Sequence, residues 1–189
     1  MTVAHRSPDR RVRALEFLRS HSACTMPHLS GTLLEHLLAT EQLLRSWGAS
    51  EDLCLAGLCH ATYGTDGFAP CLLPPDDRGP LARVVGTDVE DMVYLYASCD
   101  RAFVYPQLAA DGPVAFRDRF RAQTINPTDA QIRDFVDLTL ANELDVALSG
   151  RRRPTDALPD WIEPFVEQLR HRAGPRARLA APRLLASVP

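Results

Sequence analysis

Residues 51–65 read EDLCLAGLCHATYGT, and the centre of the fold can be predicted from them. Residues 51–62 are apolar nearly all round, which predicts a helix without a polar face. Such a helix belongs in the middle of a fold, because every side of it needs a covering layer. His60 stands near its end, and the glycine-containing loop 63–67 follows it. The stretch therefore predicts a buried central helix that carries a histidine.

The segments around this helix are also helical by their periodicity. We expect helices over residues 9–20, 30–47, 77–85, 87–101 and 128–148. Gly48 suits a left-handed C-cap, and Ser50 is a good N-cap for the central helix. Capping boxes begin at Thr87 and Thr128. Because there is no convincing strand series, the predicted fold is an all-α bundle of about six to eight helices.

The remaining segments are less regular. Residues 102–127 are interrupted by prolines and a glycine, and 115–122 is a candidate helix within them. A linker is expected over 150–159, and Asp160 is expected to cap a last helix. The tail after Gly174 is rich in proline, alanine and arginine, so we expect it to be loosely held.

The composition fits one globular domain of ordinary make-up. The 189 residues are 46% hydrophobic and 24% charged, which is enough for a sizeable core. Within this single domain we expect an N-terminal helix that packs on the core at residues 1–25. The core itself spans 26–148, and residues 149–189 provide a linker, a helix and the tail.

The net charge and the cysteines limit the binding partners and the cellular compartment that we expect. A net charge of −3 gives no general attraction to nucleic acid or anionic lipid, and the short arginine run 151–153 indicates a solvated linker. We find neither a signal-peptide pattern nor an apolar run long enough to span a membrane. The five cysteines include no CxxC pair, which indicates buried apolar residues in a reducing compartment. We expect a cytoplasmic protein with a small-molecule substrate, and leave a homodimer open.

A few polar side chains fall where the helical pattern predicts burial. His36 borders the buried stripe of its helix, and His60 ends the apolar central helix. Asp100 falls on the inward face of the helix predicted over 87–101. Asn142 and then Asp145 follow the apolar stripe of the last core helix at helical spacing. Polar groups that converge in an apolar interior are the default hypothesis for a functional site.

The segment from Leu33 to Thr40, followed by Trp47-Gly48-Ala49 and then by Leu55 to His60, resembles the core of the HD superfamily. The resemblance implies a helical bundle in which one helix supplies a metal-binding histidine and a buried helix ends in a His-Asp pair. By this resemblance His36 is the first ligand and His60 the second. Asn142 stands where the superfamily has its final Asp, after Ala.

The chain departs from the superfamily pattern at two positions. Ala61 stands in place of the paired Asp, and Asn142 in place of the final Asp. No histidine lies between His60 and His171, so the extra histidines of two-metal members are missing. The run from His60 to Thr65 is similar to an uncharacterised bacterial branch, which carries His-x-x-Tyr-Gly-Thr in place of His-Asp. The resemblance covers roughly residues 26–148.

Two enzymatic hypotheses follow for a small-molecule enzyme of specialised metabolism. In the first, His36, His60 and a carboxylate of Asp100 or Asp145 bind one divalent ion, either iron or manganese, with zinc as a further option. Such a set leaves positions open for substrate or oxygen, and the reaction is an oxidation, a hydrolysis or an elimination. In the second, no metal is bound, and the histidines act as acid and base in an isomerisation, dehydration or cyclisation. Ala61 and Asn142 replace two carboxylates of the superfamily pattern, and the loss of these negative charges fits the second hypothesis, in which no cation is bound.

Further residues complete the predicted site. Tyr63 and Asn142 join the catalytic group, since a tyrosine hydroxyl can move a proton. The expected substrate-binding residues are His28, Thr40, Thr65, Arg117 and Arg121. The two arginines suit an acidic substrate, unless one of them forms a salt bridge with Asp100. A non-catalytic small-molecule-binding module is the third hypothesis.

Overall fold

The structure, a computed structural model, describes residues 9–29, 31–151, 153 and 156–188. Its helices are α1 (Arg10–Ser20), α2 (Leu33–Ser46), α3 (Glu51–Cys59), α4 (Gly79–Val85), α5 (Thr87–Ser98), α6 (Arg101–Leu108), α7 (Asp129–Ser149), α8 (Ile162–Leu169) and α9 (Pro175–Ala186). The described residues also form two short antiparallel hairpins. In the first, β1 (Pro27–His28) pairs with β2 (Gly31–Thr32), and in the second, β3 (Phe116–Asp118) pairs with β4 (Gln123–Ile125). The predicted all-α bundle is confirmed.

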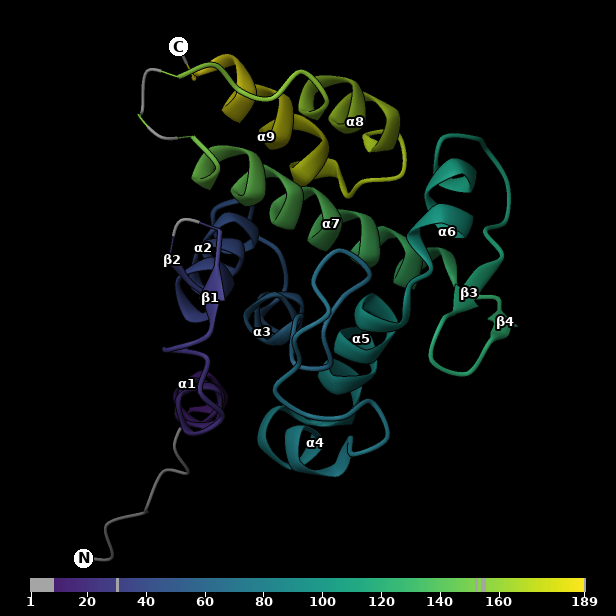
Figure 1. Ribbon diagram of the computed structural model, residues 1–189. Helices are drawn as coiled ribbons and strands as arrows, with labels where there is room; N and C mark the ends of the chain where they lie inside the picture. Colours follow the sequence, from purple (N-terminus) through teal and green to yellow (C-terminus); the bar gives the residue numbers. More distant parts are fainter. Residues whose placement is uncertain (1–8, 30, 152, 154–155, 189) are drawn as a thin grey trace, which may run out of the picture.

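The helix α3 lies in the centre of the bundle, as its apolar sequence predicts. Every residue from Leu53 to Cys59 is buried, and α1, α2, α5 and α7 contact the helix (Figure 1). Ser50 fixes its start, because the hydroxyl accepts a hydrogen bond from the Leu53 amide. Gly57 allows the close approach of α2, since a Cβ there would lie 2.5 Å from Leu44 Cδ1.

The helix α7 crosses the molecule and is covered on two sides. Figure 1 shows α8 and α9 on one side of it, and α2, α3 and α5 on the other. Consequently every residue from Leu138 to Asp145 is buried, polar ones included. The helix begins with the predicted capping box between Thr128 and Gln131. Its long buried stretch is what places polar side chains inside the bundle.

The helix predicted over 87–101 is two helices in the structure. The first, α5, ends at Ser98, and Asp100 has an extended backbone as the N-cap of α6. The Asp100 carboxylate accepts a hydrogen bond from the Phe103 amide, which favours a new helix start over continuation of the old one. The expectation that Asp100 lies on the inward face of a continuous helix is therefore wrong.

The predicted start of that helix also differs. Gly86 is the N-cap residue, and no side chain caps α5. The expected capping box of Thr87 and Glu90 does not form, because Glu90 is buried and accepts hydrogen bonds from Tyr63 and Arg78 instead. A buried carboxylate is held more strongly by a guanidinium than by a backbone amide, which explains the difference.

Three expectations for the other segments are corrected. Residues 115–122 form β3 and a turn rather than a helix, because Phe116 and Asp118 both face inward at strand spacing. The tail after Gly174 is ordered as α9, which buries Ala177, Ala181 and Leu185. Asp160 caps no helix, since α8 begins after Trp161 and has no side-chain cap.

Some expectations fall outside the described residues. They concern residues 1–8, Ser30 at the predicted start of the second helix, and positions 152, 154 and 155 of the linker. The described part of the N-terminal segment forms α1, which packs on α3 and α4. Throughout the described ranges, no helix is long and apolar enough to cross a membrane.

Candidate functional site

Two histidines from neighbouring helices face each other inside the bundle. His36 lies on α2 and His60 is the C-cap residue of α3, and their Nε2 atoms are 3.3 Å apart. Both residues are buried, with exposed fractions of 5% and 1%. The capping box between Thr32 and Glu35 fixes the first turn of α2 and so the direction of His36. The two imidazoles that the sequence singles out therefore share one interior position.

The helix α7 supplies the other two members of this cluster. Asp145 Oδ2 lies 2.6 Å from His36 Nδ1, and Asn142 Oδ1 lies 3.0 Å from His36 Nε2. Both side chains are buried. We call His36, His60, Asn142 and Asp145 the histidine cluster. It joins three helices that are adjacent in the bundle but distant in the sequence.

Hydrogen bonds on the outer side of the cluster show which of the atoms that face its centre are hydrogen-bond acceptors. His60 Nδ1 donates to the Gly57 carbonyl at 2.7 Å, and His36 Nδ1 donates to the Asp145 carboxylate, because neither partner can donate. The Asn142 amide nitrogen donates to Glu143 Oε1 at 3.0 Å, so its oxygen faces His36. Three acceptor atoms thus converge, namely the two Nε2 atoms and the amide oxygen. Either one shared proton or a cation satisfies such a set.

Burial sets the protonation of two of the histidines. It lowers the pKa of His60 to about 3, and the neighbouring charge of His36 adds to the effect. Burial, followed by the charge of His36, also lowers the pKa of His28 to about 4. Both imidazoles are therefore neutral near pH 7. The Asp145 carboxylate lies 2.6 Å from Nδ1 of the third histidine, His36.

A cavity of about 390 Å³ leads to the cluster from the surface. His28, Glu35, His36, Asp145 and Ser149 contribute polar groups to its wall. The hairpin β1–β2 brings His28 over His36, with ring centroids 4.4 Å apart. His28 Nε2 is buried and has no hydrogen-bond partner within the described residues. A ligand in this cavity would meet His28, His36 and Asp145 together.

Arg101 and Glu143 lie beside the histidine cluster and hold Asn142, an arrangement that no sequence pattern predicts. Arg101 Nη1 donates to Glu143 Oε1 at 2.9 Å, and the same oxygen accepts from the Asn142 amide. The hydroxyls of Tyr96 and Tyr105 are buried nearby without hydrogen-bond partners in the described chain. Arg101 is the first residue of α6, and no periodicity or motif marks it. Only the packing of α6 against the bundle reveals its part in orienting Asn142.

Two of the predicted catalytic residues lie outside the cluster. Asp100 caps α6 and lies 3.8 Å from the Arg117 guanidinium, where both side chains are partly exposed. A salt bridge between Asp100 and one of the two arginines was the alternative to a catalytic role for Asp100, and the structure contains that pair. The Tyr63 hydroxyl donates to the buried Glu90 at 2.7 Å, and burial raises its pKa far above the usual value. Tyr63 therefore lies at a buried ion pair and is not among the residues that line the cavity.

Of the predicted substrate-binding residues, one lines the cavity and the others lie elsewhere. His28 lines the cavity. Thr65 pairs through its backbone with Phe68, and Thr40 is buried on α2 with a hydroxyl that has no partner among the described residues. Arg121 stacks on Tyr94 in a different hollow. Together with Arg117 at Asp100, this removes both predicted arginines from the cavity that reaches the cluster.

The converging atoms are a weak set for a metal ion. Among the described residues, no group of three or more His, Cys, Asp or Glu side chains is arranged to hold one. The expected set of two histidines and a carboxylate is not assembled, because Asp145 binds the Nδ1 side of His36 and Asp100 lies elsewhere. What converges is two imidazole nitrogens and an amide oxygen. A divalent ion there has no anionic ligand to balance its charge.

The comparisons with known proteins concern the first half of the chain. Residues 17–101 match the model of a family described as a domain of unknown function, DUF6817. The matched part contains His28, His36 and His60, whereas Asn142 and Asp145 lie beyond it. No curated protein and no solved structure matches the chain significantly. The chain is thus similar to this family over less than half of its length.

Proposed function

We propose that the protein is a small-molecule enzyme that transfers protons without a metal ion, with the histidine cluster as its catalytic centre. The observation that carries this is the convergence of three acceptors on one point, with Asp145 on the opposite side of the His36 ring. One proton on His36 Nε2 satisfies all three acceptors, and the carboxylate balances the resulting charge. No other ion is needed.

The cavity gives each residue a role in this proposal. A substrate in it meets the Asp145 carboxylate, which takes a proton from one position of the substrate and returns it to another, while the His36 Nδ1–H group donates to this carboxylate and holds it in place. His28 Nε2, which has no hydrogen-bond partner among the described residues, holds a polar group of the substrate. His60 and Asn142 hold the far nitrogen of His36 and so keep its ring in place. The reaction classes that suit such a centre are isomerisation, dehydration and cyclisation.

A second candidate function retains the cluster and adds one divalent ion. It is favoured by the outward hydrogen bonds of both Nδ1 atoms, since histidine ligands usually donate their other ring N–H in this way. The separations of 3.0 and 3.3 Å are slightly shorter than the spacing of about 3.4 Å between two ligands of a tetrahedral ion at bonds of roughly 2.1 Å. His36, His60 and Asn142 would hold the ion, which would act as a Lewis acid.

Labelled histidines distinguish the two candidates. We expect nitrogen NMR of the EDTA-treated protein near pH 7 to show His36 protonated on both nitrogens and His60 on Nδ1 only. Titration with zinc is expected to leave these signals in place. An Asn142→Asp variant, which adds an anionic ligand, serves as the positive control for zinc binding. Stoichiometric zinc that shifts both Nε2 signals of the unaltered protein supports the metal-dependent function and contradicts ours.

Solvent exchange tests catalysis itself. The EDTA-treated protein is incubated in D₂O with a panel of small hydroxy and carbonyl compounds, and mass spectrometry measures deuterium uptake. We expect uptake into at least one compound that an Asp145→Asn variant slows by about 10² or more. An Arg183→Gln variant, altered on the distant α9, is the control. Uptake that is equal in both variants, or absent throughout, contradicts the proposal and leaves a binding module.

A further inference from the structure

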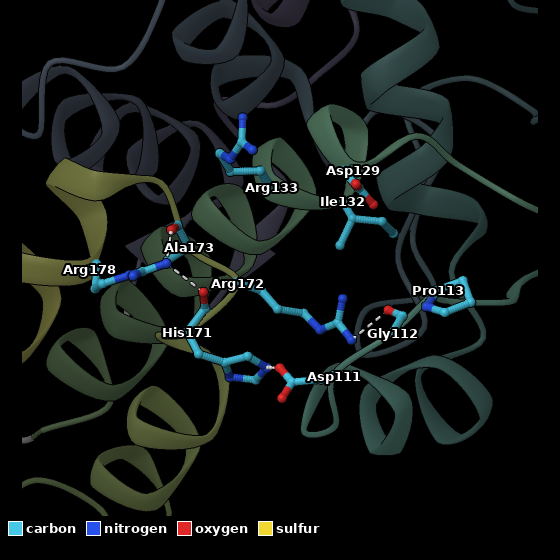
Figure 2. Close-up of a pocket in the computed structure, with 10 residues that line it drawn as sticks. All are labelled: Asp111, Gly112, Pro113, Asp129, Ile132, Arg133, His171, Arg172, Ala173 and Arg178. Carbon is cyan, nitrogen blue, oxygen red and sulfur yellow. Dashed lines mark hydrogen bonds and ion pairs between the residues drawn. The ribbon is translucent and has the colours of Figure 1, made fainter.

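A second hollow, built from three other segments, is lined by arginines. It encloses about 610 Å³ between the loop 111–113, the first turns of α7, and the turn 171–173 with the start of α9 (Figure 2). Arg133, Arg172 and Arg178 line it. Its volume lies within the range of small-molecule sites. None of its lining residues belongs to the histidine cluster or its cavity.

Arg172 is fixed in place by the loop that it holds. Its Nε donates to the Leu108 carbonyl at 3.2 Å, and its Nη2 donates to the Gly112 carbonyl at 2.9 Å and to the Ala110 carbonyl. These bonds leave Nη1 without a partner in the described part of the chain. Figure 2 shows this end of the guanidinium pointing into the open space between Ile132 and Pro113. The charge is thus oriented before any ligand arrives.

Two more guanidinium groups border the same space. Arg178 is held by the carbonyls of His171 and Ala173 through Nη2 alone. Arg133 is exposed on α7 and forms no hydrogen bond or ion pair within the described residues. Arginine side chains that are anchored but only partly used retain donors for a further acceptor.

The carboxylates in the wall do not neutralise these arginines. Asp111 is fully exposed, and its nearest cationic group within the described residues is His171, with 3.9 Å between Oδ1 and Nε2. Asp129 belongs to the first turn of α7, and no ion pair links it to any of the three guanidinium groups among the described residues. The hollow therefore presents three guanidinium groups that form no ion pair with Asp111 or Asp129 among the described residues. Asp137 of α7 lies near Arg133 and Arg178, but burial raises the pKa of its carboxyl to about 6, which weakens its negative charge.

We propose that this hollow binds a small anion that carries a phosphate or a carboxylate group. Guanidinium groups match the paired oxygens of both, and they bind them with charge-assisted hydrogen bonds. The concave shape selects a small molecule rather than an extended nucleic acid, which the net charge of −3 would also disfavour. The proposal is independent of the acid–base function, because no residue is shared.

Calorimetric titration of the full chain in low-chloride buffer tests the proposal. The probes are inorganic phosphate and succinate, which separate a phosphate site from a dicarboxylate site. We expect saturable binding of at least one probe, with one site per chain. Arg133→Gln is the main variant, because this side chain forms no hydrogen bond or ion pair among the described residues, and we expect it to weaken binding roughly tenfold. Arg178→Gln provides a second variant with a comparable loss.

Matched controls separate a specific site from general charge. Arg183→Gln removes the same charge from α9 outside the hollow, and we expect it to bind as the unaltered chain does. His36→Ala is also expected to bind normally, so failure here is distinct from failure of the catalytic proposal. The absence of saturable binding for both probes overturns the inference. Equal affinity in Arg133→Gln and Arg183→Gln overturns it as well.

Discussion

His36 on α2 and Asp145 on α7 form a buried pair, with Nδ1 and Oδ2 2.6 Å apart across 109 residues of sequence. Their side chains are 3% and 9% exposed. Ser149 donates a hydrogen bond to the second oxygen of the carboxylate at 3.2 Å. The pair therefore links the first core helix to the last and also forms the wall of the cavity. It combines a structural role with the proposed catalytic one.

Asp145→Ala is expected to lower the free energy of unfolding by about 3–5 kcal/mol, because it leaves His36 without its buried counter-charge. Urea denaturation measures this. The double variant with His36→Ala should lose clearly less than the sum of the single losses, which shows coupling. Asp134→Asn is the control on the same helix, since burial already raises the pKa of that carboxyl. Additive losses would show that the two residues do not act as a pair.

Acid is expected to destabilise the fold partly through His60. Its pKa is lowered to about 3 by burial, so the unfolded chain, with an ordinary value of about 6.5, binds the proton more readily. The stabilising effect is full above the unfolded value and declines as the pH falls from about 6.5 toward 3. Between pH 7 and pH 4 the loss is about 3 kcal/mol.

The comparison of variants isolates this contribution. In His60→Gln, the unfolding free energy should fall less steeply between pH 7 and pH 4 than in the unaltered protein. His171→Gln, at an exposed position, should leave the slope unchanged. The same slope in all three proteins would show that another group governs acid unfolding.

Tyr63→Phe is expected to lose only about 0.5–1.5 kcal/mol, because Arg78 still holds the Glu90 carboxylate when the hydroxyl is gone. Arg78→Ala should lose about 3–5 kcal/mol, since it leaves a buried charge unpaired. Denaturant midpoints give both values. In the D₂O exchange assay, Tyr63→Phe should retain the activity of the unaltered protein. A loss of exchange without a loss of stability would restore Tyr63 to the catalytic group.

Gly64→Ala is expected to cost roughly 2 kcal/mol or more, because the backbone there has a φ of 68°, which side chains disfavour. A Cβ would also lie 2.9 Å from the Ala69 carbonyl oxygen, which is backbone and cannot swing away. Thermal unfolding measures the cost. Gly79→Ala is the control, since its φ is not positive and the nearest contact is the flexible end of Arg83. An equal effect of both would mean that the turn at Gly64 imposes no constraint.

The fold class and the interior position of His36 and His60 could be predicted from the sequence. The apolar run from Leu53 to Cys59 has no polar face, and a helix of that kind is stable only at the centre of a bundle. Local signals such as Ser50 and the capping box at Thr128 also fixed helix starts, because their hydrogen bonds lie within one turn. These features depend on residues that are close in the sequence, so they can be predicted without the tertiary structure.

Which polar groups meet inside the bundle depends on the packing of helices that are distant in the sequence. Asp100 and Tyr63 look suitable by helical spacing, yet a helix break and a buried ion pair remove them from the cluster. Asp145 approaches the outer nitrogen of His36 rather than the inner one, and Arg101 reaches Asn142 through Glu143. Each of these contacts depends on how separate helices pack. Periodicity gives the face of a helix on which a side chain lies, but it does not give the atom that the side chain meets on another helix.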